Sequence, residues 1–220
     1  MVFTIATAFL TTVLFIFLIL ASSLLYKKRN NEQFNIRNCF PFELNYHSEF
    51  KENFYTHLLI GLYVIASCGF YATFHMSYNN GYLIFIMIGG ILSSLAIYAL
   101  FYIPLLKIKL HIVVDAIYFA LRLAISGAII ILGLRITQNN MSWASVTSIV
   151  LSAISFLATT GIIINPRLTL DFRAKEAIKE NGEKEYVRPK FVVLAFSEWL
   201  LIFLNIFNIL NIVILTFTLK

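Results

Sequence analysis

The chain has 220 residues, of which 60% are hydrophobic and 13% charged, and its mean hydropathy is +0.83. A soluble domain holds about 25% charged residues, so this composition excludes an ordinary soluble protein and indicates a membrane protein. The net charge of +6 does not indicate nucleic-acid binding, because the basic residues flank apolar segments, where they orient the protein and contact lipid headgroups. The two cysteines, Cys39 and Cys68, predict neither a disulfide nor a redox site.

The apolar runs along the chain predict six transmembrane helices. Each run holds roughly 20 apolar residues, the length that spans a bilayer. Because positive charge follows the first run instead of preceding it, we interpret that run as an uncleaved helix and not as a signal peptide. The predicted helices cover residues 2–26, 53–74, 82–106, 111–134, 141–164 and 191–218. We therefore expect an all-α, polytopic integral membrane protein with a single transmembrane domain, 1–220, built as a bundle of about six helices.

The segment 27–52, between the first two helices, mixes charged and aromatic residues. Pro41 breaks any long helix there, and aromatic rings among charges are typical of the headgroup layer. Glu43 and His47 are four residues apart, and we expect them to lie in a solvated loop.

The segment 166–190 is the second charged stretch. Thr169 is predicted to cap a short helix that continues to about Glu180, with Gly182 as its stop. Its basic residues are expected to contact membrane lipids, and the segment is also a candidate docking site for a cytoplasmic partner protein.

The distribution of positive charge predicts the orientation. Fourteen of the seventeen Lys and Arg residues lie in the segments 27–53, 107–111 and 166–190. The positive-inside rule places these segments in the cytoplasm. Both termini are then expected outside, in a multi-pass protein of the cell membrane.

The helix predicted at 111–134 carries a polar stripe. Steps of four, three, four and four residues place five side chains on one face: His111, Asp115, Tyr118, Arg122 and Ser126. The other side carries a ladder of small residues, which lets a neighbouring backbone approach closely in lipid: Ala116, Ala120, Ala124 and Ala128. We therefore expect this helix inside the bundle, packed through its alanines.

Three ionisable groups at membrane depth need partners, because each costs about 2.5–3.5 kcal/mol on insertion scales. At roughly 1.5 Å per residue, Asp115 lies about 6 Å, Glu198 about 10 Å and Arg122 about 16 Å from the cytoplasmic edge. Helix side chains lean toward the N-terminus, so we predict that Arg122 pairs with Glu198, with Asp115 beside them. Further hydrogen bonds in this network are expected from Tyr118, Ser126 and Asn205.

The predicted network has three interpretations. It fixes which helices pair and in what register, it lines a hydrated path or solute site, or it is catalytic. No HExxH, GxSxG, Walker A or GxGxxG motif occurs, so we predict no catalytic residue, no metal and no cofactor. His111 and Asp115 have the spacing of two metal ligands on one helix face, but we favour a solvated histidine at the interface.

Small polar side chains on the last two helices are interpreted as contacts between helices. On the helix at 141–164 they repeat every three or four residues, as in closely packed helix pairs: Ser145, Ser148, Ser152, Ser155 and Thr159. Asn208 and Asn211 on the final helix are expected to hydrogen-bond to neighbouring helices.

The sequence thus predicts a transport component with a polar intramembrane site for a small solute or ion. Two alternatives stay open: a non-enzymatic membrane assembly or interaction subunit, and an intramembrane or lipid-acting enzyme. Membrane lipids are the expected contacts, a partner membrane subunit is a further candidate, and no nucleic acid is expected.

Overall fold

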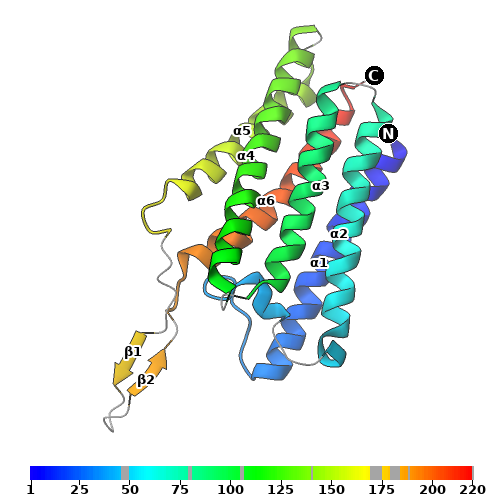
Figure 1. The fold of residues 1–220 in the computed structure, drawn as a ribbon. Coiled ribbons are helices and arrows are strands. Elements are labelled where there is room, and N and C mark those ends of the chain that lie inside the picture. The colour runs from blue at the N-terminus through cyan, green and yellow to red at the C-terminus, as the bar shows by residue number, and fades with distance from the viewer. Residues whose placement is uncertain are drawn as a thin grey trace.

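The computed structural model describes residues 1–45, 50–78, 81–104, 107–139, 141–168, 175–178, 184–187 and 189–219. Its helices are α1 (Val2–Asn30), α2 (Phe50–Ser77), α3 (Gly81–Tyr102), α4 (Ile108–Asn139), α5 (Trp143–Ile163) and α6 (Val193–Thr216). All six are long and apolar enough to cross a membrane, which confirms the predicted multi-pass helical bundle. Figure 1 shows both termini at the same end of the bundle.

α6 is the most buried of the six helices. Helices that follow one another from α1 to α5 pack side by side, and α6 packs against α1, α4 and α5. The exposed side chains of α6, Phe203 and Leu210, are apolar, whereas its polar side chains are buried. The polar side chains of α6 therefore lie inside the bundle.

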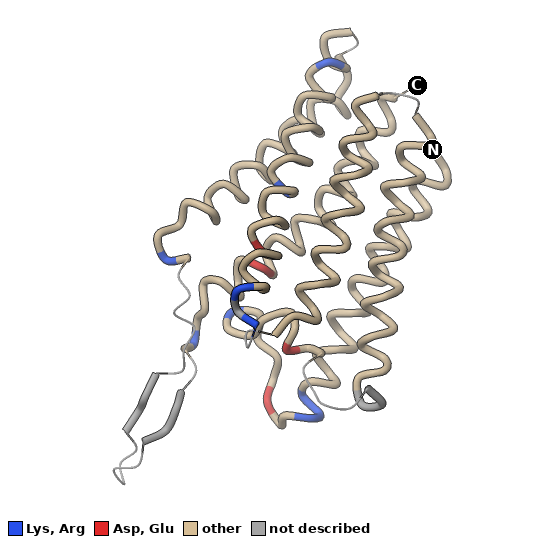
Figure 2. The backbone as a smooth tube through the Cα atoms, viewed as in Figure 1, with Lys and Arg blue, Asp and Glu red and all other residues tan. Residues whose placement is uncertain are grey.

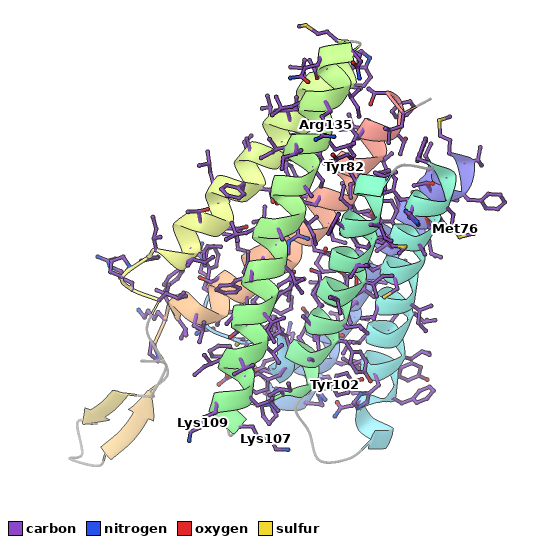
Figure 3. The ribbon with its side chains drawn as sticks, turned by 45° about the horizontal axis from the view of Figure 1, so that its top comes forward. Met76, Tyr82, Tyr102, Lys107, Lys109 and Arg135 are labelled. Atoms are coloured by element: carbon purple, nitrogen blue, oxygen red, sulfur yellow. The ribbon has the colours of Figure 1, made fainter. Side chains whose placement is uncertain are left out.

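Positive charge gathers at the end of the bundle opposite to the two termini (Figure 2). Figure 3 shows Lys107 and Lys109 at this end, which we call the basic end, and Arg135 toward the other end. The Arg135 guanidinium lies over the Tyr82 ring, 4.1 Å from its centroid, a cation–π contact. By the positive-inside rule, the basic end is the one predicted to face the cytoplasm.

Residues 31–45, which we call the end segment, pack against the bundle at its basic end. The segment contains the short 3-10 helix η1 (Pro41–Leu44). Two hydrogen bonds, both 2.8 Å long, hold it to α6 and to the residue before α6. Trp199 Nε1 donates to the Cys39 carbonyl, and the Val192 backbone N–H donates to the Arg37 carbonyl. The segment therefore covers the basic ends of the helices.

The prediction of a solvated loop at Glu43 is wrong. This side chain is 8% exposed, and its Oε1 accepts a hydrogen bond from the Phe40 backbone N–H at 2.8 Å. The aromatic rings that suggested the headgroup layer instead fill the interior: Phe40 and Phe42 are both buried. His47 lies outside the described residues.

The short helix predicted after Thr169 is also wrong over the residues that the structure describes. Strand β1 (Lys175–Ile178) pairs antiparallel with strand β2 (Lys184–Val187), with Lys175 opposite Val187. The strand at 175–178 contradicts a helix over those residues, and Gly182, its predicted stop, lies outside the described residues.

The alanine ladder of α4 does not pack as predicted. Ala116, Ala120 and Ala124 are exposed, and Ala128 is only partly buried. The polar side chains on the opposite face need hydrogen-bond partners, so that face turns toward α6 and the alanines turn outward. The seam of α5 does pack inward as expected, since its four serines and Thr159 are all buried.

Gly90 on α3 permits a close contact with α2. A Cβ atom at this position would overlap the ring of Tyr71, which is itself fully buried. Gly90→Ala is therefore expected to destabilise the protein by about 1–3 kcal/mol, the usual cost of overpacking, in a thermal unfolding measurement in detergent. Gly61→Ala on α2 is the control, because a Cβ there meets nothing within 4 Å; equal stability of the two variants would contradict the contact.

Candidate functional site

The polar residues of α6 face three other helices. Four of them are fully buried: Glu198, Asn205, Asn208 and Asn211. Their steps of seven, three and three residues keep them on the inward side of a helix whose lipid-facing side is apolar. Each lies at a separate level along the bundle, with Glu198 nearest to the basic end.

The level nearest the basic end holds the acid cluster, which we define as His111, Asp115 and Glu198. His111 Nε2 lies 3.0 Å from Glu198 Oε1 and 3.7 Å from Asp115 Oδ2. The other ring nitrogen, Nδ1, lies 2.8 Å from the Ile103 carbonyl oxygen. α4 and α6 thus bring two carboxyl groups to one nitrogen of the imidazole ring.

The prediction of a solvated His111 is wrong, because the side chain is completely buried. The rings of Phe40 and Phe42 in the end segment lie edge-on to the imidazole, with centroids 6.0 and 5.9 Å away. The sequence did not predict this burial, because the end segment was expected in the headgroup layer and not over His111.

The acid cluster is short of positive charge. Among the residues that the structure describes, none donates a hydrogen bond to either oxygen of Asp115 or to Glu198 Oε2. Asp115 is 4% exposed and Glu198 is not exposed at all. Within the described part of the chain, His111 is the only basic side chain within 4.0 Å of either carboxylate. Two buried carboxylates in this setting need a bound cation or protons.

Arg122 and Asn205 form the next level. The guanidinium donates to Asn205 Oδ1 at 2.9 Å and to the Leu204 carbonyl at 2.8 Å. The Asn205 amide donates to the Tyr63 hydroxyl at 3.0 Å, and the Tyr71 hydroxyl donates to Asn205 Oδ1 at 3.2 Å. This node joins α2, α4 and α6.

The predicted ion pair between Arg122 and Glu198 is therefore absent from the described residues. Hydrogen bonds from α4 to α6 join residues 82 or 83 positions apart, at Tyr118 and at Arg122 alike. This register aligns Glu198 with Asp115 and Asn205 with Arg122. Counting depth from the ends of the apolar segments placed Glu198 too close to the level of Arg122.

The remaining predicted site residues hold helices together. The Tyr118 hydroxyl donates to the Leu201 carbonyl at 2.9 Å. Ser126 donates to Ser155 of α5 at 3.1 Å and accepts from the Asn208 amide at 3.2 Å. Of the six predicted residues, Asp115 and Glu198 thus belong to the acid cluster. The other four make hydrogen bonds between helices: Tyr118, Arg122, Ser126 and Asn205.

Sequence reasoning missed the contributions of His111 and of the two tyrosines of α2. The four-residue spacing of His111 and Asp115 was the signal for the first. Tyr63 and Tyr71 gave no signal, because a tyrosine in an apolar helix is as common on a lipid-facing side as in a polar network.

Comparison with known proteins gives no match, whether with protein-family models, with curated proteins or with solved structures.

Proposed function

We propose that this protein is a transport component whose acid cluster binds a cation on its way across the membrane. The observation that carries the proposal is the convergence of Asp115 and Glu198 on His111 with no Lys or Arg beside them among the described residues. Buried ionisable groups in membrane helices mark ion and solute pathways. The Arg122 guanidinium, by contrast, donates two hydrogen bonds, to Asn205 and to the Leu204 carbonyl.

The position of the cluster supports the same function. It lies near the basic end, beneath Phe40 and Phe42, so a cation that reaches it from that side passes the end segment. Farther along α6, the side-chain oxygens of Asn208 and Asn211 are buried and accept no hydrogen bond within the described residues. Amide oxygens of this kind are suitable ligands for a dehydrated cation.

Thiol accessibility tests this proposal. With Cys39 and Cys68 replaced by serine, a single cysteine at Asp115 is expected to react with a small, positively charged thiol reagent in intact membranes. Ala116→Cys is the matched control, because the neighbouring residue is exposed on the outer face of α4, where lipid excludes the reagent. Absence of labelling at both positions would indicate a network without water and would favour the assembly-subunit alternative.

A further inference from the structure

We propose that the acid cluster binds a divalent first-row transition-metal ion, with His111 Nε2 and one oxygen each of Asp115 and Glu198 as ligands. The inference rests on the proposed cation site and names the class of cation. Three observations carry it: the hydrogen bond of His111 Nδ1 to the backbone, the spacing of the ligand atoms, and three carboxyl oxygens without a donor among the described residues.

The hydrogen bond of His111 to the backbone determines its tautomer. A carbonyl oxygen only accepts, so Nδ1 carries the proton that it shares with the Ile103 carbonyl at 2.8 Å. In the neutral ring, Nε2 then presents a lone pair to Glu198 and Asp115, so its 3.0 Å contact with Glu198 Oε1 is favourable only when a proton or a metal ion lies on that nitrogen. A metal-bound histidine has this same arrangement, with one nitrogen on the ion and the other donating to a carbonyl.

The distances suit a shared ion. The three candidate ligand atoms lie within 4.8 Å of one another, with Nε2 at 3.0 Å from Glu198 Oε1 and 3.7 Å from Asp115 Oδ2. Two ligands at about 2.1 Å from a tetrahedral zinc ion lie about 3.4 Å apart. Three protein ligands leave one position open, as at zinc sites that exchange water or substrate.

The unsatisfied oxygens point to the same ligand. Both oxygens of Asp115 and one of Glu198 are buried without a hydrogen-bond donor from the described residues. A divalent ion neutralises both carboxylates at once. The imidazole favours zinc, iron, nickel or copper over magnesium and calcium, whereas the two carboxylates moderate that preference.

Zinc binding by the purified full chain in detergent tests the inference, measured by competition with a chromophoric chelator. We expect one zinc ion per chain. His111→Gln, Asp115→Asn and Glu198→Gln are each expected to weaken binding at least ~10- to 100-fold, since losing an outer-shell partner alone costs that much. His57→Gln is the matched control, because this histidine lies outside the acid cluster and contacts Tyr102. Size-exclusion chromatography and circular dichroism report folding of each variant.

X-ray absorption by the zinc-loaded wild-type chain keeps the test valid if a variant fails to fold. We expect only nitrogen and oxygen ligands, at about 2.0–2.2 Å, whereas a zinc–sulfur distance of about 2.3 Å would assign the ion to a cysteine and overturn the inference. Absence of zinc binding by the wild type, or equal binding by the three variants, would also overturn it.

The two proposals fail in different ways. Zinc binding that depends on the three residues, together with an unreactive cysteine at Asp115, would keep the metal site and reject transport. A reactive cysteine at Asp115 without zinc binding would keep a hydrated cation path and reject the transition metal.

Discussion

Replacing Asn205 with alanine is expected to lower the free energy of unfolding by about 3–5 kcal/mol, because three buried groups lose a hydrogen-bond partner and each costs about 1–3 kcal/mol. The Arg122 guanidinium loses an acceptor, and the hydroxyls of Tyr63 and Tyr71 lose their amide partner. All four side chains are fully buried, so water cannot replace these bonds without entering the bundle. Reversible unfolding in detergent micelles measures the change.

Asn208→Ala is the matched control on the same helix. This amide donates to Ser126 at 3.2 Å, a contact between neutral groups that is worth about 0.6–1.7 kcal/mol in a membrane. Adding Arg122→Met to the Asn205→Ala variant removes the guanidinium charge that has lost its acceptor. This second change is expected to restore much of the lost stability. Equal losses from the two alanine variants, or no recovery in the double variant, would show that Arg122 does not depend on Asn205.

Truncating Trp199 is expected to have a similarly large effect. This side chain is completely buried, and its ring lies edge-on to Phe34 and Phe101, with centroids 5.6 and 6.1 Å away. Trp199→Ala removes this packing and the hydrogen bond to the Cys39 carbonyl, so we expect a loss of about 3–5 kcal/mol. Trp143→Ala is the control, because the other tryptophan of the chain is 70% exposed and its removal is expected to change stability little.

The conservative variant Trp199→Phe separates the hydrogen bond from the packing. It is expected to keep the fold and to loosen the end segment, which the tryptophan N–H ties to α6. The rate at which a thiol reagent modifies Cys39, which is 5% exposed, reports this opening in a Cys68→Ser background. An unchanged rate would show that other contacts hold the segment in place.

The fold could be predicted from hydropathy because each helix must satisfy its own backbone in lipid. The inward position of Asn205, Asn208 and Asn211 followed from the same rule applied to side chains. The levels at which helices meet could not be predicted, because register depends on where each helix begins, and α6 begins at Val193, not at the start of its apolar run.

The larger error was the prediction that the end segment lies in the headgroup layer. Alternation of aromatic and charged residues describes both a headgroup-layer loop and a cap that closes a bundle, and composition does not distinguish them. The deciding contacts join residues 160 positions apart, as between Cys39 and Trp199. Only the tertiary structure brings them together, and with them the cover over His111 that makes the acid cluster a buried site.

The pairing of α4 with α6 bears on how the chain is made. His111 and Arg122 leave the ribosome within α4, but their partners Glu198 and Asn205 lie on α6, which follows more than eighty residues later. α4 must therefore wait in the translocon or in lipid with unsatisfied charges, at about 2.5–3.5 kcal/mol each, until α6 arrives. By contrast, α6 meets its partners on α2, α4 and α5 already synthesised. The buried polar contacts of α4 with α6 thus form only when α6 inserts, after the helices that surround it.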